Sequence, residues 1–201
     1  MLPTDIPTPD TAAARAALEI ATEYYSESLL NHCQRAWLWS VGFATEESRE
    51  FDAELLYVAA LLHDIGLVEE FDNHTLAFEN GGGHVAIALT AGAGWDAARR
   101  TRVHEIIERH MWLSVDPAQD VEGYLLETAT ALDISGARAD ALPTDFQRAV
   151  LAAHPRLRLA EEFGAHVTDQ ARRKPGTSSE RIVKGGVVRK LADNPLEQLG
   201  R

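Results

Sequence analysis

Cysteine is nearly missing from this chain, and it has neither a long apolar run nor an excess of positive charge. Cys33 is the one cysteine among 201 residues, so no disulfide can form within the chain. A single thiol is typical of a reducing compartment. No stretch approaches the roughly 18–20 apolar residues that a membrane-spanning helix needs, and the first residues lack the basic and apolar regions of a signal peptide. We therefore expect a cytoplasmic protein that does not enter a membrane.

Basic residues are few. The 31 acidic residues outnumber the 19 basic ones, which gives a formal net charge of -12. A surface this negative repels phosphate backbones, which argues against nucleic acid as a partner. It does not exclude a small phosphorylated ligand, because a bound cation can dominate the field inside one pocket. We expect a small-molecule substrate, and the sequence leaves open a homo-oligomer.

What the chain does have is helical periodicity. Its length and its 45% hydrophobic content suit one domain with a real core, and no strand-like alternation with a hairpin signal stands out. Apolar spacings of three and four predict helices from residue 11, over about 28–44, 48–65, 84–93, 96–111 and 121–135, between Pro143 and Pro155, and over about 156–171. The sequence therefore predicts an all-α fold.

The predicted organisation has three segments. Residues 1–10 contain three prolines and form an N-terminal arm, residues 11–171 form the helical domain, and residues 172–201 form a loose C-terminal tail. Within the domain, residues 66–81 are polar and end in a run of three glycines, so we expect a long loop there.

The strongest chemical signal is the pair His63-Asp64 at the end of an apolar helix. Leu62 before it and Ile65 after it imply burial, and a buried aspartate is costly unless it is paired or bound to a cation. A helix-end carboxylate bonded to a backbone donor is the alternative for this pair. Asp133 lies in an equally apolar predicted helix and requires a partner for the same reason.

The order His32, His63-Asp64, Asp133, with each group on its own predicted helix, resembles the HD-domain superfamily of metal-dependent hydrolases. Within it, the cyanamide hydratase-like branch is the most similar. That likeness rests on Asn31-His32 with Arg35, the stretch 54–67, Phe78-Glu79, Gly82-Gly83, Ile107 with His110, and the stretch 129–133. It covers about residues 17–135.

The resemblance implies that His32, His63, Asp64 and Asp133 hold one divalent metal ion. Two imidazoles and two carboxylates form a mixed nitrogen and oxygen site that suits Zn, Fe or Mn. Some superfamily members carry further histidines and bind two metals, and His84 and His110 lie where such histidines would be. The sequence therefore leaves open whether a second ion binds. We favour one metal, with His110 as an acid/base residue of the pocket.

The resemblance also implies a metal-activated water that acts on a small molecule, with Asp64 as a residue that orients it. Our first expectation is a phosphohydrolase for a phosphoester or nucleotide, with Arg35 as a phosphate contact one helical turn after His32. A surface salt bridge is the alternative for Arg35. The second expectation is a lyase that hydrates a nitrile such as cyanamide, with Phe78-Glu79 and Gly82-Gly83 in a loop over the metal. A non-catalytic metal-containing ligand-binding module is the third.

Overall fold

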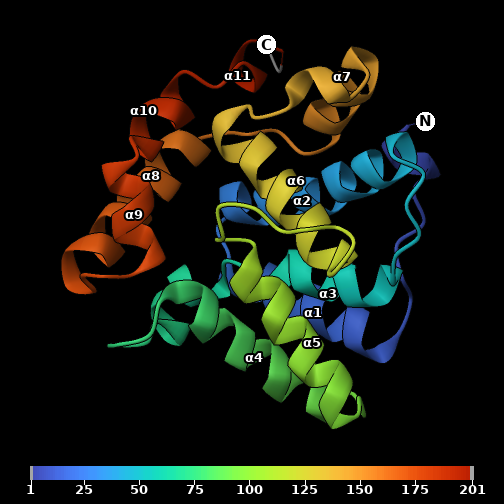
Figure 1. Ribbon diagram of the computed structural model, residues 1–201, viewed down its shortest axis with the longest axis vertical. Helices are drawn as coiled ribbons and strands as arrows, with labels where there is room; N and C mark the ends of the chain where they lie inside the picture. Colours follow the sequence, from blue (N-terminus) through green and yellow to red (C-terminus); the bar gives the residue numbers. More distant parts are fainter. Residues whose placement is uncertain (1, 200–201) are drawn as a thin grey trace.

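All regular structure in residues 2–199, the part of the chain that the computed structural model describes, is helical (Figure 1). The all-α prediction is confirmed. The α-helices are α1 (Ala12–Tyr24), α2 (Glu27–Glu46), α3 (Ala53–Leu62), α4 (Phe78–Gly92), α5 (Ala97–Arg109), α6 (Val121–Ser135), α7 (Thr144–Ala153), α8 (Leu159–Arg173), α9 (Ser178–Lys184), α10 (Val187–Ala192) and α11 (Leu196–Leu199). Four short 3-10 helices are η1 (Pro3–Asp5), η2 (Ile65–Leu67), η3 (Glu69–Phe71) and η4 (Ala139–Ala141). None of the described helices has the length and apolar character that crossing a membrane requires.

Helix α3 is the central element. Every residue from Leu55 to Leu62 is buried, as expected for a helix that is apolar on all sides. Helices α1, α2, α4, α5 and α6 all pack against it. The helix begins after Asp52, whose carboxylate accepts from the Leu55 amide. The predicted start at residue 48 is too early, because Ser48 has a left-handed backbone with φ of 52°. Because five helices surround α3, its C-terminal end lies inside the protein.

The glycine run of residues 81–83 belongs to α4 and not to a loop. Helix α4 begins at Phe78 and the three glycines are buried in it. Gly66 has no room for a side chain, because a Cβ there would overlap the Phe78 carbonyl oxygen. A Cβ on Gly82 would lie 3.0 Å from the Leu62 carbonyl oxygen. These glycines let α4 approach the end of α3 closely, which is a packing role and not a flexible linker.

The C-terminal segment differs from the loose tail that the sequence predicts. It forms α9, α10 and α11, and Val187, Leu191 and Leu196 are buried. Helices α9 and α10 pack against α8, in the orange and red part of the ribbon (Figure 1). Helix α10 also packs against α6, and α11 packs against α7. Gly186, with a φ of 79°, separates α9 from α10. Helices this short leave almost no periodic pattern for sequence reasoning to find.

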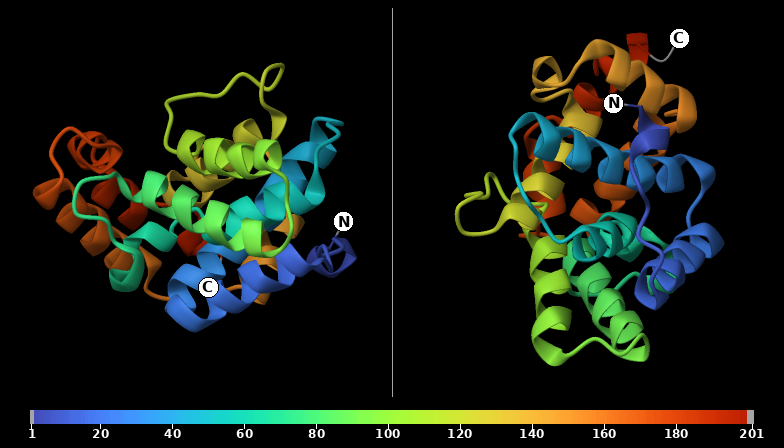
Figure 2. Two further views of the ribbon diagram at one scale, coloured as in Figure 1. Left: turned by 90° about the horizontal axis from the view of Figure 1, so that it is seen from below. Right: turned by 90° about the vertical axis from the view of Figure 1, so that its right-hand side faces the viewer.

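A loop between α5 and α6 projects from the body in both further views (Figure 2). Its last residue, Asp120, caps α6 by accepting a hydrogen bond from the Gly123 amide. The same carboxylate lies 2.6 Å from a nitrogen of Arg102 and 2.5 Å from one of Arg109. Asp120 therefore fixes the start of α6 to the end of α5. Both helices match their predicted positions.

Candidate metal centre

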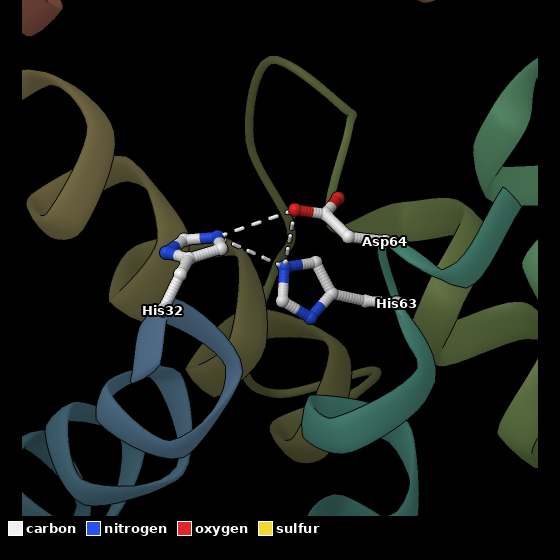
Figure 3. A group of neighbouring side chains, drawn as sticks. All are labelled: His32, His63 and Asp64. Atoms are coloured by element: carbon white, nitrogen blue, oxygen red, sulfur yellow. Dashed lines mark hydrogen bonds and ion pairs between the residues drawn. The ribbon is translucent and has the colours of Figure 1, made fainter. Parts of the chain in front are cut away.

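His32, His63 and Asp64 converge from two helices (Figure 3). His32 lies in α2, His63 is the residue that ends α3, and Asp64 follows it directly. The two Nε2 atoms are 3.1 Å apart, and each is 3.4 Å from Oδ2 of Asp64. Each residue is at most 1% exposed. One ligand-type atom from each lies within 4.8 Å of the others, so the three side chains could hold one metal ion.

A fourth side chain faces the same carboxylate. His110 directly follows α5 and is 6% exposed. Its Nε2 lies 3.9 Å from Oδ1 of Asp64, and its ring centroid is 4.8 Å from that of His63. The pocket position predicted for His110 therefore has geometric support, and three imidazoles surround one carboxylate.

Hydrogen bonds on the outer side of each ring direct Nε2 inward. Nδ1 of His63 donates to the Ala60 carbonyl oxygen at 2.8 Å, and Nδ1 of His110 donates to the carbonyl oxygen of Ile107. Nδ1 of His32 lies 2.7 Å from a carboxylate oxygen of another helix. Because these oxygens can only accept, the proton of each neutral ring lies on Nδ1 and the lone pair on Nε2. Metal-ligating histidines are held in this way.

The centre of the cluster lacks a positive partner. Two Nε2 lone pairs that face each other at 3.1 Å repel unless a proton or a cation lies between them. Both carboxylate oxygens of Asp64 are buried without a hydrogen-bond donor. Burial would raise the pKa of Asp64, but the His63 and His32 rings hold it below its usual range, so the carboxylate stays charged. A divalent ion would satisfy all these atoms, and the nitrogen and oxygen donors suit Zn, Fe or Mn.

The protonation of the three rings also suits a metal. Burial, together with the nearby His63 ring, lowers the pKa of His110 to about 3. Burial lowers the pKa of His63 as well. For His32, burial acts in the same direction, but the nearby carboxylates of Asp133 and Asp64 outweigh it and raise its pKa. At neutral pH, His63 and His110 are therefore unprotonated, as metal ligands must be.

The structure places Asp133 behind His32 and not among the inward-facing atoms. Its carboxylate accepts two hydrogen bonds from Arg35, at 2.8 and 2.7 Å, and one from Trp39 Nε1 at 2.8 Å, in addition to its contact with His32. Burial would raise its pKa, but Arg35 and Arg156 hold it well below the usual range. Because the protein supplies all these donors, Asp133 supports the His32 ring. Its predicted role as a metal ligand stays a prediction.

Arg35 does not reach the cavity at this cluster. The side chain is fully buried. Besides Asp133, its guanidinium donates to the carbonyl oxygens of His154 and Pro155, at 3.0 and 3.2 Å. A planar guanidinium whose nitrogens are occupied in this way cannot also turn to a phosphate. The phosphate contact predicted for Arg35, and with it a catalytic role, has no basis in this geometry.

Other positions that the sequence singled out also lie away from the cluster. His84 is exposed, and its ring lies 5.0 Å from that of His104. Glu79 is buried at the start of α4. None of these side chains, and none of the glycines of α4, lines the cavity described next. The structure therefore gives no support to a second metal ion bound by His84. It gives none to a loop of Glu79 and the α4 glycines that covers the metal.

A cavity of about 360 Å³ opens from the cluster, whose four side chains form its floor. Sequence reasoning missed its other charged groups, which are Glu127 of α6 and two cations of the C-terminal helices, Arg181 and Lys190. Burial raises the pKa of Glu127. Glu127, like Asp133, is a charged residue in the apolar helix α6, so the same sequence signal marks both. The two cations carry no comparable signal, because surface lysines and arginines are common.

Comparison with known proteins agrees with this geometry. Residues 29–193 match the family model described as HD domain. The cyanamide hydratases DDI2 and DDI3 of Saccharomyces cerevisiae are each 31% identical to the chain over 174 residues, which is 85% of this chain and 77% of each relative. The range matched by the family model contains all four side chains of the cluster, His32, His63, Asp64 and His110.

Proposed function

The chain belongs to the HD-domain family, and we propose that it is a metal-dependent enzyme that adds water to the C≡N carbon of a small molecule. The observation that carries the proposal is the buried group of His32, His63 and Asp64, with Nε2 of His110 facing the same carboxylate, in a cavity that all four side chains line. The names of the two yeast relatives support hydration of C≡N as the reaction.

The placement of positive charge favours hydration over phosphoester hydrolysis. A phosphate bound at the cluster would need cations beside it. Arg35 is directed to Asp133, and the cations that line the cavity, Arg181 and Lys190, are exposed at its mouth. A nitrile carbon carries no charge and needs no such partner. Hydration therefore ranks above phosphoester hydrolysis, the reverse of the order expected from the sequence.

We propose that His32, His63, Asp64 and His110 hold one divalent ion, with Asp133 as the residue that positions His32. Such an ion, when bound, lowers the pKa of a coordinated water toward about 7 and polarises an electrophile. The hydrogen bonds from Nδ1 of each ring fix the orientation of the donors before the ion binds. This preorganisation is what second-shell partners supply in metal sites.

Hydration requires little of the protein beyond positioning and proton transfer. The oxygen of water forms a C=O double bond with the carbon, both C≡N π bonds are lost as both protons of the water reach nitrogen, and nothing leaves. Cyanamide becomes urea in this way without an oxidant or reductant. Glu127 lines the cavity, and its pKa is raised by burial. A carboxyl group with a pKa closer to neutrality suits proton transfer to the nitrogen.

The test is a paired assay of the metal-loaded protein. One arm follows urea formation from cyanamide, and the other follows phosphate release from nucleoside monophosphates and phenyl phosphate. We expect urea and no phosphate. Glu127→Gln should lower kcat by roughly 100-fold while metal content is kept. Phosphate without urea would instead establish a phosphohydrolase, and silence in both arms with metal bound would favour the non-catalytic ligand-binding module.

A further inference from the structure

The cavity is much larger than the smallest compound that carries a C≡N group of this type. Its volume is about 360 Å³. A water molecule in the liquid occupies about 30 Å³. On that scale the cavity holds about a dozen non-hydrogen atoms, whereas cyanamide has only three. Cyanamide would therefore fill about a quarter of the space above the cluster.

The walls of the cavity are mostly apolar and come from distant parts of the chain. They include Trp112 and Leu113 of the projecting loop, Ile134 of α6, Phe163 of α8, Ile182 of α9 and Val187 of α10. Trp112 is 50% exposed and Leu113 is 87% exposed, so these two lie at the opening. An apolar body between the floor and the mouth would remove this surface from water. The C-terminal helices thus form one side of the cavity.

The mouth carries positive charge on a protein that is otherwise strongly negative. Arg181 and Lys190 are exposed cavity residues, and neither forms an ion pair within the described range. Arg181 donates to the carbonyl oxygen of Met111, and Lys190 has no hydrogen-bond partner among the described side chains. Two cations that form no ion pair among the described residues, on a chain with a formal net charge of -12, favour an anionic group at the opening.

We propose that the substrate is a C≡N compound with an apolar body of several carbons and an anionic group at its far end, which Lys190 and Arg181 bind at the mouth. The inference rests on the proposed function for the reacting end of the molecule. Its other end is argued independently, from the volume, the apolar walls and the two cations.

The experiment uses N-alkyl cyanamides whose chains of about six carbons fit the cavity and end in a methyl, a carboxylate or an ammonium group. We expect kcat/KM to be highest for the carboxylate-ended compound, lower for the methyl-ended one and lowest for the ammonium-ended one. An exposed ion pair changes an equilibrium by up to roughly fivefold, so Lys190→Gln should reduce the carboxylate-to-methyl ratio by about that factor. Arg181→Gln should act in the same direction. The control is Arg189→Gln, which alters an exposed neighbour in α10 that does not line the cavity.

Binding supplies a second readout that does not depend on turnover. The corresponding alkyl ureas contain no C≡N group, and their affinity for the metal-free protein is measured by calorimetry. We expect the carboxylate-ended urea to bind more tightly than the methyl-ended one, with a difference that shrinks in Lys190→Gln and at high salt. Equal affinities, or a preference unchanged by Lys190→Gln and Arg181→Gln together, would overturn the inference. If the preference depends on Lys190 but the protein hydrates no C≡N compound, the anion-binding role of the cavity opening is supported and the proposed function is rejected.

Discussion

Asp133 and Asp64 are both fully buried carboxylates, and the structure predicts opposite consequences when each is replaced by asparagine. Asp133 is held between Arg35 and Arg156, with Oδ2 2.7 Å from Arg35 and Oδ1 3.4 Å from Arg156. Asp133→Asn would leave Arg35 buried without its anion. Breaking a buried ion pair from one side costs about 3–5 kcal/mol. The metal-free variant should therefore lose that much unfolding free energy.

Asp64→Asn should behave differently. Neither oxygen of Asp64 has a hydrogen-bond donor, so the substitution removes a buried charge that no side chain of the described region satisfies. The metal-free variant should lose less unfolding free energy than Asp133→Asn, because this substitution leaves no arginine buried without its anion. It should, however, lose the metal. Asp133→Asn should keep it with an affinity roughly 10–100-fold weaker, the usual cost of changing a residue that orients a ligand.

The assay is urea denaturation of each protein in the presence of a chelator, followed by metal titration of the same samples. A wild-type unfolding curve for Asp133→Asn, combined with complete loss of metal, would refute this reasoning. That result would make Asp133 a direct ligand, as the sequence resemblance implies, and would require its side chain to leave Arg35 when metal binds.

Three further substitutions, at His110, Gly66 and Asp120, test the metal site and the packing around it. His110→Ala should weaken metal binding by at least about tenfold, as elemental analysis after dialysis would show; unchanged metal content would make His110 an acid/base residue only. Gly66→Ala should cost about 1–3 kcal/mol in urea denaturation, because its Cβ overlaps the Phe78 carbonyl, whereas the control Gly92→Ala meets no atom within 4 Å and should not destabilise. Two arginines, countering burial, lower the pKa of Asp120 below its unfolded value of about 3.9, so its stabilising effect is complete above that pH and is lost as pH falls through the folded pKa. Asp120→Asn should therefore be less stable than wild type by about 1.5–3 kcal/mol at pH 7. In chemical denaturation, this difference in unfolding free energy should narrow below about pH 3.9. A difference that does not change with pH would exclude the charge of Asp120 as its cause.

The helices around the cluster were predictable because their signals are local. Asp96 accepts a hydrogen bond from the Arg99 amide and begins α5 as the sequence predicts. The apolar run that ends at His63 forms α3, and the predicted range 121–135 is α6 as observed. In each case the signal lies within a few residues along the chain, so no knowledge of distant contacts was needed.

The parts that sequence reasoning missed depend on contacts between distant segments. The glycines of residues 81–83 are typical of a loop, yet they are helical because α4 must approach Leu62 and Gly66 closely. The C-terminal helices are held in place by residues that show no helical periodicity in the sequence. Asn194, for example, donates to the carbonyl oxygen of Asp133 at 2.9 Å. The tail therefore supports the residue behind the metal centre, a role that a polar composition does not suggest.

The two buried aspartates show where sequence reasoning about a metal site reaches its limit. An apolar helix with a charge in it establishes that the charge has a partner, but not whether the partner is a cation from solvent or a side chain from elsewhere. For Asp133 the partner is Arg35, which lies 98 positions away in the chain. For Asp64 the folded protein supplies no donor at all within the described residues. A carboxylate that remains unsatisfied after every side chain has been placed is the stronger candidate for a metal ligand, and by that criterion the centre of this site is Asp64.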